Sequence, residues 1–269
     1  MDKNISNRAY IHKNAVIGKN VTIAPFAVIE ENVRIGDNTV IGPNVHITGW
    51  TDIGKNCEIH SGAVIGDAPQ DYNYKGDKSY TIIGDNNIIR ECVTIHRGTE
   101  PESKTIIGNN NMFMAYSHIA HNCIVKDNIV LVNQVSLAGY VTVDNNAFIS
   151  AVVQIHQFCK IGKYVMIGAI SKVVKDIPPY MLAGGSEVAT IRGLNSIGLR
   201  RAGFSPDERE LIKKAYKILY HSGLNVSQAL EAIDKDEELK DNELIKEIVE
   251  FIKSSKRGIA AHFKKEHSS

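Results

Sequence analysis

The sequence predicts an all-β solenoid, a parallel β-helix built from hexapeptide repeats, followed by a C-terminal α-helical domain. Three observations carry this prediction. An apolar residue recurs every six residues from Ile11 to Val173, the recurrence stops before Pro178 and Pro179, and helix-capping signals begin only after that point. A six-residue period fits neither an α-helix nor a coiled coil, whereas hexapeptide repeats are typical of parallel β-helices.

The apolar recurrence is nearly unbroken. Of the 28 positions reached in steps of six from Ile11 to Val173, 25 are apolar, and the exceptions are Asp71, Asp77 and Pro101. Four residues after each apolar position the side chain is usually small. A large and a small inward side chain fit the narrow interior of a triangular coil, in which three hexapeptides make one turn. The repeat then gives about nine coils, each pairing with the next.

Glycine often follows the apolar residue, as at Gly18, Gly36 and Gly54. Such positions suit corners where chains approach closely or where φ is positive. Two segments, residues 67–80 and 98–104, leave the pattern without losing its phase. Loops that leave a rigid scaffold are common places for function.

We therefore place one β-helix domain at residues 1–190, with an extruded loop at about 67–80, and an α-helical domain at residues 191–269. Ser205 and Pro206 predict the start of a helix, with Ser as N-cap and Pro at the first helical position, and Gly223 can end it. Shorter helices are expected at about 227–232 and 242–254. These helices are expected to cap the open end of the solenoid.

Composition excludes several classes of function. Lys and Arg number 31 and Asp and Glu 30, for a net charge of +1, so nucleic acid is not an expected partner. The first residues contain no apolar signal region, and the chain contains no integral membrane segment of 18 apolar residues. The four cysteines form no CxxC pair and are expected to be reduced thiols, which points to the cytoplasm.

Histidines are the first candidates for chemistry. Five recur in the repeat at spacings close to two coils, which predicts one shared groove: His60, His96, His118, His121 and His156. By phase, His96, His121 and His156 are expected at corners or outward positions, on the surface of the prism. Such a cluster fits a general base near neutral pH or a zinc site. Zinc-dependent hexapeptide-repeat carbonic anhydrases usually carry a His-x4-His pair, and the spacing here is His-x2-His, so no metal is expected.

Three cysteines, Cys57, Cys123 and Cys159, fall in the small inward position and are expected to fill the core. Cys123 as a nucleophile beside His121 stays open as an alternative.

Several motifs together resemble one family, the acyl-[acyl-carrier-protein]–UDP-N-acetylglucosamine O-acyltransferases of lipid A synthesis. The motifs are QDYNYKGD at 70–77, TIHRGT at 94–99, SHIAHNC at 117–123, LAGYV at 137–141, QIHQFCKIG at 154–162, VVKDIPPY at 173–180 and GLNSIGLRRAGFS at 193–205. The resemblance implies a left-handed β-helix and a homotrimer with active sites between subunits. It also implies transfer of an (R)-3-hydroxyacyl chain from acyl carrier protein to the 3-position of the UDP-sugar, with no cofactor.

The resemblance also implies roles for individual residues. His121 would be the general base, Asn122 its neighbour in the catalytic group, and Gly139 the oxyanion-hole donor. Ala169 would help to set the length of the acyl groove. Residues that would contact the acceptor are Gln70, Asp71, Asn73, His118, Tyr140, His156, Gln157, Asn195 and Arg201. A basic patch for the acidic carrier protein is expected at Lys172, Lys175, Arg200, Arg201, Lys213 and Lys214.

Some positions depart from the pattern that the family usually shows. Asn122 stands in place of an Asp that orients the base, Asn73 in place of a Lys, and Tyr140 in place of a His; Ile197 and Ala202 replace a Glu and an Arg. An amine needs less help from a base than a hydroxyl does, so a 3-amino UDP-sugar stays open as the acceptor. A sugar-nucleotide acetyltransferase with hexapeptide repeats is the other alternative. A metal hydratase and a purely structural solenoid are the least favoured classes.

Overall fold

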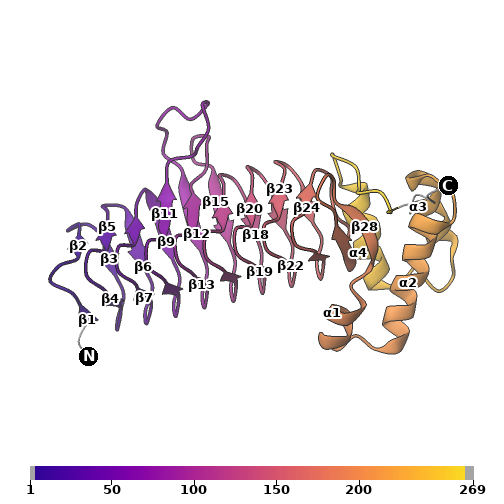
Figure 1. The fold of residues 1–269 in the computed structure, drawn as a ribbon, viewed down its shortest axis with the longest axis horizontal. Coiled ribbons are helices and arrows are strands. Elements are labelled where there is room, and N and C mark those ends of the chain that lie inside the picture. The colour runs from indigo at the N-terminus through magenta and orange to yellow at the C-terminus, as the bar shows by residue number, and fades with distance from the viewer. Residues whose placement is uncertain (1–3, 264–269) are drawn as a thin grey trace.

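The structure is a computed structural model that describes residues 4–263, and it shows a long triangular prism with a helical domain at its C-terminal end (Figure 1). Within these residues the strands form three sheets, and each sheet takes every third strand along the chain. All pairings are parallel except the last, between the two final strands of the first sheet. This is the parallel β-helix that the hexapeptide period predicts, with three hexapeptides in each coil.

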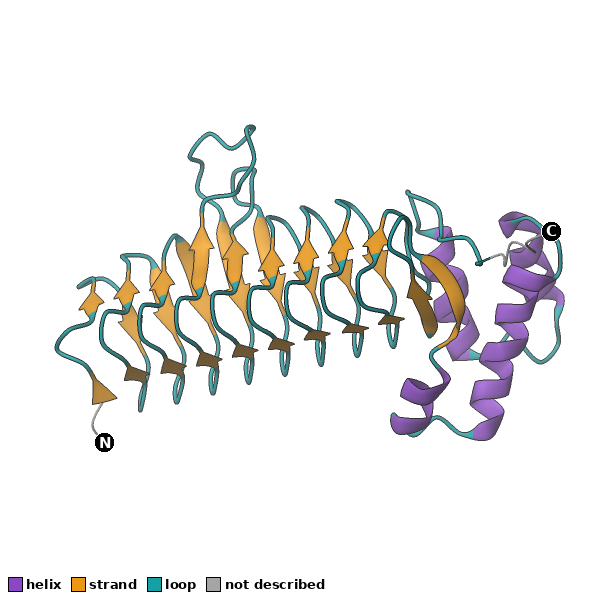
Figure 2. Cartoon of the chain, in the orientation of Figure 1, coloured by secondary structure: helices purple, strands orange, loops and turns teal. Residues whose placement is uncertain are grey.

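The strands are short because each side of the prism is only one hexapeptide wide (Figure 2). The first sheet, sheet A, contains β1 (Asn4–Ile5), β4 (Thr22–Ile23), β7 (Val40–Ile41), β10 (Glu58–Ile59), β13 (Ile88–Ile89), β16 (Met112–Phe113), β19 (Val130–Leu131), β22 (Phe148–Ile149), β25 (Met166–Ile167), β27 (Met181–Gly184) and β28 (Thr190–Leu194). Sheet B contains β2 (Tyr10–Ile11), β5 (Val28–Ile29), β8 (His46–Ile47), β11 (Val64–Asp67), β14 (Thr94–His96), β17 (His118–Ile119), β20 (Ser136–Leu137), β23 (Gln154–Ile155) and β26 (Lys172–Val173). Sheet C contains β3 (Val16–Ile17), β6 (Val33–Ile35), β9 (Trp50–Ile53), β12 (Tyr80–Ile83), β15 (Lys104–Ile107), β18 (Ile124–Val125), β21 (Thr142–Val143) and β24 (Lys160–Ile161).

The core follows the hexapeptide pattern. Ile29, Ile47 and Ile95 are fully buried, and so is the small residue two places before each of them, such as Ala27 before Ile29. Cys57, Cys123 and Cys159 are buried in the same small position, as expected. At the open N-terminal end, Ile11 and Ile17 are only partly buried.

Most of the glycines after the apolar residues serve close approach, and Gly66 also adopts a positive φ of 80°. A Cβ on Gly36 would lie 2.6 Å from the backbone of Gly54 in the next coil, and φ at Gly36 is ordinary. The left-handed corner falls two residues later, where asparagines such as Asn38 and Asn56 adopt positive φ. Asparagine tolerates this conformation better than most residues, and here Asn38 Nδ2 donates to Asn56 Oδ1 (3.2 Å).

Two insertions interrupt an otherwise regular register. Ile35 pairs with Ile53, 18 residues on, whereas Ile53 pairs with Ile83 and Ile83 with Ile107. The first of these two steps spans twelve extra residues and the second six. They correspond to the segments predicted to be extruded, and the longer one rises from the ends of β11 and β12 as a loop (Figure 1).

The helices are α1 (Ser196–Arg201), α2 (Pro206–His221), α3 (Val226–Lys235) and α4 (Glu243–Lys253). Ser205 caps α2 as predicted, in a reciprocal capping box with Glu208. α3 extends beyond both ends of the expected segment, α4 lies within the expected segment, and α1 was not predicted. Tyr180, from the end of the solenoid, is fully buried in the helical core beside Leu199 and Ile212. No helix in the described part is long and apolar enough to cross a membrane.

Candidate active site

The extruded loop is held in one position by Arg97, which follows β14. Its Nη1 donates to the Gly66 carbonyl (2.8 Å), and its Nη2 and Nε donate to the Tyr74 hydroxyl (2.9 and 3.2 Å). The Tyr74 hydroxyl in turn donates to the Asp77 carbonyl (2.9 Å). A charged side chain thus joins the base of the loop to its middle, three residues after Asp71.

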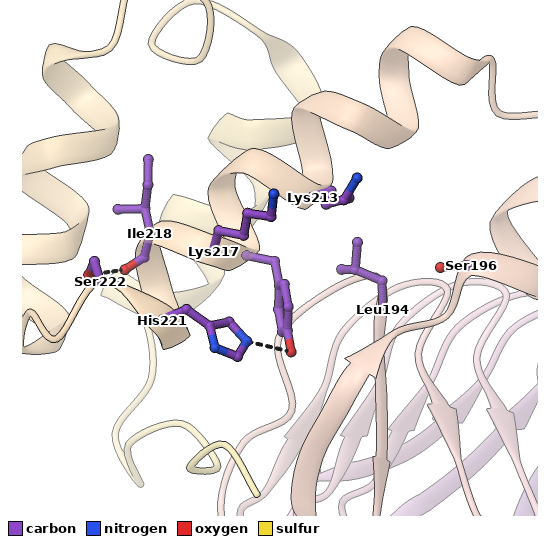
Figure 3. Close-up of a pocket in the computed structure, with 8 residues that line it drawn as sticks. Leu194, Ser196, Lys213, Lys217, Ile218, His221 and Ser222 are labelled. Carbon is purple, nitrogen blue, oxygen red and sulfur yellow. Dashed lines mark hydrogen bonds between the residues drawn. The ribbon is translucent and has the colours of Figure 1, made fainter. Parts of the chain in front are cut away.

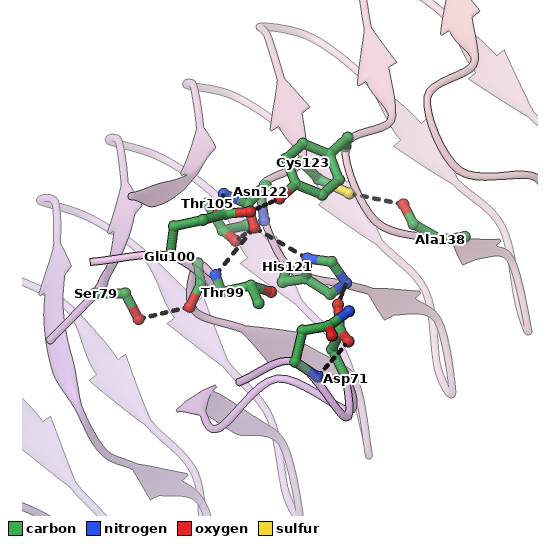
Figure 4. A network of polar contacts seen from close by, with 12 residues as sticks. Asp71, Ser79, Thr99, Glu100, Thr105, His121, Asn122, Cys123 and Ala138 are labelled. Carbon is green, nitrogen blue, oxygen red and sulfur yellow. Dashed lines mark hydrogen bonds and ion pairs between the residues drawn. The ribbon is translucent and has the colours of Figure 1, made fainter. Parts of the chain in front are cut away.

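Asp71 is directed at His121. Its Oδ1 accepts from the Asn73 N–H (2.9 Å), which tightens the loop into an Asx turn. Its Oδ2 lies 3.5 Å from His121 Nε2 (Figure 4). Between the loop and sheet B lies a cavity of about 510 Å³, hereafter the loop cavity. Its lining residues are Gln70, Asp71, Tyr72, Asn73, His118, Ala120, His121, Ser136, Ala138, Gly139, Gln154, Ile155 and Gln157.

His121 is held in one tautomer. Asn122 Oδ1 accepts a hydrogen bond from the Thr99 N–H (3.0 Å), so this atom of the amide is the oxygen. His121 Nδ1 lies 2.9 Å from the same oxygen and therefore donates to it. In the neutral imidazole, Nε2 is then the nitrogen that carries no hydrogen, and it faces Asp71 and the loop cavity, where it can accept a proton.

Gly139 lies against the imidazole. A Cβ at this position would fall 2.5 Å from His121 Cε1 and 2.7 Å from Nε2, so no larger residue fits without moving the ring. Within the described chain the Gly139 N–H donates no hydrogen bond. It is therefore available to an oxygen that develops negative charge beside His121.

The buried His96 and the half-buried His118 lie next to His121, with the ring centroids of His96 and His118 5.0 Å apart. Burial, followed by the nearby His96 and His121, lowers the pKa of His118 to about 4. Burial also lowers the pKa of His96. Both rings are neutral at neutral pH, and Thr94 Oγ1 lies 2.7 Å from His118 Nδ1.

The prediction of surface histidines is wrong for two of the three. His96 is 4% exposed and His121 is 7% exposed, because residues of the extruded loop lie beside them. His156 is exposed as predicted. His60 does not join the groove, because the twelve-residue insertion breaks the assumption that 36 residues make two coils. It follows β10 in sheet A and lies 3.7 Å from Glu91.

The Cys123 alternative fails on geometry. The thiol is buried in the core and donates to the Ala138 carbonyl (3.2 Å), pointing away from the cavity. Burial raises the pKa of this thiol to about 12, so the nucleophilic thiolate is not available near neutral pH. Among residues 4–263, no group of three or more potential metal ligands is arranged to hold an ion.

Several of the predicted acceptor contacts meet in the loop cavity, namely Gln70, Asp71, Asn73, His118 and Gln157. Tyr140 stands beside the cavity, with its ring edge-on to His121 at 5.4 Å. The exposed His156 places Nδ1 3.1 Å from the Gln157 carbonyl oxygen. Glu100 was not predicted, yet it contacts Asn122 and Tyr140; its place in the shorter extruded segment was the only signal.

Asn195 and Arg201 lie elsewhere. They line a second cavity of about 900 Å³ beside sheet A, with Phe148 and Met166. Asn195 also caps α1, because its Oδ1 accepts from the Gly198 N–H (3.1 Å). Ala169 is exposed at the corner after β25 and lines neither cavity.

A third cavity, of about 700 Å³, lies between β28 and α2 and includes Lys213, Lys217 and His221 (Figure 3).

The basic patch expected for the carrier protein is weaker than its sequence suggests. Lys213 pairs with Glu210 (2.9 Å), and Lys214 pairs with Asp236 and Glu238 (both 2.7 Å). Two of its six cations are therefore largely neutralised.

Comparison with known proteins gives consistent similarities. The family described as "Udp N-acetylglucosamine O-acyltransferase; Domain 2" matches residues 176–260, and "Bacterial transferase hexapeptide (six repeats)" matches residues 32–67. An acyl-[acyl-carrier-protein]–UDP-N-acetylglucosamine O-acyltransferase of Aliarcobacter butzleri is 45% identical, over 95% of this chain and 97% of that protein.

Solved structures are equally similar. A UDP-N-acetylglucosamine acyltransferase from Bacteroides fragilis superposes with a TM-score of 0.91 at 49% identity, covering 94% of this chain and 98% of that one. The enzyme of the same name from Francisella novicida gives a TM-score of 0.92 at 45% identity, over 96% and 94% of the two chains. The predicted fold class, a left-handed parallel β-helix with a C-terminal α-helical domain, is confirmed.

Proposed function

The chain belongs to the family of acyl-[acyl-carrier-protein]–UDP-N-acetylglucosamine O-acyltransferases, and from this premise we propose that it transfers an acyl chain from acyl carrier protein to the 3-position of UDP-N-acetylglucosamine. The family resemblance implies that the acyl chain transferred is an (R)-3-hydroxyacyl group and that the reaction is the first step of lipid A synthesis. The single observation that carries the proposal is the hydrogen bond between His121 Nδ1 and Asn122 Oδ1, which leaves Nε2 of the neutral ring as an acceptor beside a cavity lined by the predicted acceptor contacts.

The chemistry follows from three groups. His121 Nε2 takes the proton of the sugar 3-hydroxyl while the hydroxyl oxygen attacks the carbonyl carbon of the thioester. The Gly139 N–H stabilises the negative oxygen of the tetrahedral intermediate. The carbon–sulfur bond then breaks, the thiolate of the donor leaves, and it takes the proton back from His121. Asp71, 3.5 Å from Nε2, stabilises the imidazolium that forms in between.

The active unit is proposed to be a homotrimer with sites between subunits. One chain does not bring the whole predicted site together, because Asn195 and Arg201 lie beside sheet A whereas the loop cavity lies along sheet B. A neighbouring subunit that lays its sheet A side against the loop cavity would supply them. An Arg at that place suits the phosphates of the nucleotide. The cytoplasmic location inferred from the sequence stays a prediction.

A transfer assay tests the function. Purified protein is given acyl carrier protein loaded with a series of (R)-3-hydroxyacyl chains, or acetyl-CoA, together with UDP-N-acetylglucosamine or its 3-amino analogue. We expect transfer from the carrier protein to the hydroxyl sugar, and a loss of about 10²–10⁴-fold in His121→Ala with the fold intact. Transfer from acetyl-CoA alone would favour the acetyltransferase alternative. A kcat/KM higher for the amine would favour the 3-amino acceptor.

A further inference from the structure

We propose that Glu100 is a positioning residue of this reaction, which orients His121 through the side-chain amide of Asn122. The inference rests on the proposed acyl transfer. Glu100 lies in the shorter extruded segment, 98–104. It follows Thr99, whose N–H donates to Asn122 Oδ1 (3.0 Å), and its own Oε2 accepts from Asn122 Nδ2 (3.1 Å).

The need for such a residue arises from the chemistry of asparagine. A carboxylate beside an imidazole presents an acceptor in either orientation, whereas an amide presents an oxygen in one orientation and a donor in the other. If the Asn122 amide turned over, Nδ2 would face His121 Nδ1. The imidazole proton would then move to Nε2, and the atom facing the loop cavity would no longer accept a proton. The orientation of Asn122 therefore decides whether His121 is a base.

Glu100 closes off the wrong orientation. Its carboxylate accepts hydrogen bonds and donates none, so it holds the Nδ2 side of Asn122, while the Thr99 N–H holds the Oδ1 side. Asn122 is also anchored by its backbone N–H, which donates to Thr105 Oγ1 (2.8 Å). With the amide held at both ends, Oδ1 remains directed at His121 Nδ1 (2.9 Å).

Glu100 is itself held by Tyr140. The Tyr140 hydroxyl donates to Glu100 Oε1, and this bond holds the pKa of Glu100 below its ordinary value, which keeps the carboxylate charged. The Tyr140 ring stacks on Phe158 (4.8 Å) and meets His121 edge-on. Tyr140 and Asn122, two departures from the usual family pattern, are thus joined by one carboxylate; Figure 4 shows Glu100 beside Asn122.

Glu100 influences His121 mainly by orienting the Asn122 amide and less by its negative charge. Glu100 is exposed, so solvent screens its long-range attraction for an imidazolium. Its hydrogen bond to Asn122 is a direct contact, so solvent screening weakens it much less than the long-range attraction. Because the amide remains an acceptor for His121, the base keeps its tautomer without an adjacent carboxylate, and this favours the hydroxyl sugar over the amine as acceptor.

The chain offers a matched control in Glu102. It lies on the same segment, is exposed, and accepts a hydrogen bond from a tyrosine hydroxyl, that of Tyr80 (2.6 Å). Its hydrogen bonds do not lead to His121. We expect Glu100→Ala to lower kcat about tenfold, the size of one hydrogen bond to a charged group, with both KM values within about twofold of the original. Glu102→Ala should keep the original kcat. Equal rates in the two variants would overturn the proposal.

Rescue distinguishes orientation from general damage. In the Asn122→Asp variant the carboxylate of residue 122 presents an acceptor to His121 in either orientation. Adding Glu100→Ala to this variant should therefore not lower kcat further. If Glu100→Ala lowers kcat by the same factor in the Asn122→Asp background as in the unaltered protein, Glu100 does not act through the orientation of Asn122.

A readout without substrate keeps the test separate from the proposed function. Nitrogen-15 NMR of labelled histidine, with His121→Gln to assign the signal, reports which imidazole nitrogen carries the proton. We expect Nδ1–H in the unaltered protein and in Glu102→Ala, and a growing Nε2–H population in Glu100→Ala. An unchanged tautomer in Glu100→Ala would sink the inference. Absence of transfer by the unaltered protein would instead sink the proposed function.

Discussion

Gly139 and His121 are packed so closely that a Cβ on residue 139 would lie 2.5 Å from Cε1 of the imidazole. Real Cβ atoms do not approach other atoms this closely, so an alanine here must displace the ring or the corner of the coil. His121 and Gly139 lie at the same edge of the prism in neighbouring coils. The contact therefore couples the position of the proposed base to that of the proposed oxyanion donor.

We therefore expect Gly139→Ala to lower kcat by about 10²-fold or more, since an error of about 1 Å in placing a catalytic group has that size of effect. Gly184→Ala is the control, because a Cβ there would meet Ser171 Oγ at an ordinary 3.6 Å. Steady-state kinetics and circular dichroism on both variants check the prediction. Full activity of a folded Gly139→Ala protein would show that the ring moves without consequence.

Stability should depend on pH through His118. Its pKa is about 4 in the folded chain and about 6.5 when unfolded. Between these values the unfolded chain binds a proton that the folded one does not, so stability is full above pH 6.5 and falls as pH drops toward 4. The loss is at most about 3 kcal/mol per chain. Urea unfolding at pH 7 and pH 4.5 measures it, and His118→Gln should show a smaller difference than the unaltered protein.

The stability of the fold should depend on Asp176, which holds the C-terminal segment against the end of the solenoid through Ser255. The Asp176 side chain is 1% exposed, and it accepts from the Lys160 N–H (2.8 Å) and the Ser255 hydroxyl (2.6 Å). Asp176→Ala leaves two half-buried donors without this partner, which costs up to about 1–3 kcal/mol for each. Asp37 accepts from the Lys19 N–H (2.7 Å) at an exposed corner, where water can replace it. Thermal unfolding should therefore shift strongly for Asp176→Ala and little for Asp37→Ala.

Chain-length selection is expected to depend on Ala169. The family resemblance gives this position a place at the floor of the acyl groove, and an alanine fills one methyl more than a glycine. We expect Ala169→Gly to extend the preferred donor, with discrimination of about 1–3 kcal/mol per methylene. Competition between donors of different length measures the profile. An unchanged profile would remove Ala169 from this role.

The sequence by itself determined the solenoid. A six-residue apolar period can bury its side chains only if the chain turns after each hexapeptide, so Ile29, Ile47 and Ile95 had to face inward. The capping residues of α2 are equally local, because Ser205 and Glu208 satisfy each other within one turn. These features depend on neighbours in sequence, and they were predicted correctly.

Only the tertiary structure decided the environment of the site. His121 looked exposed by phase, yet Asp71 reaches it from a loop 50 residues earlier in the chain, and the partial burial of His118 follows from the same enclosure. His60 was misplaced because the number of residues in an extruded loop is not fixed by the repeat. Glu100 acquires its role solely by lying between Asn122 and Tyr140, which stacking of the coils brings together. Periodicity fixes which way a side chain points, whereas hydrogen-bond partners, burial and pKa depend on what the other coils place around it.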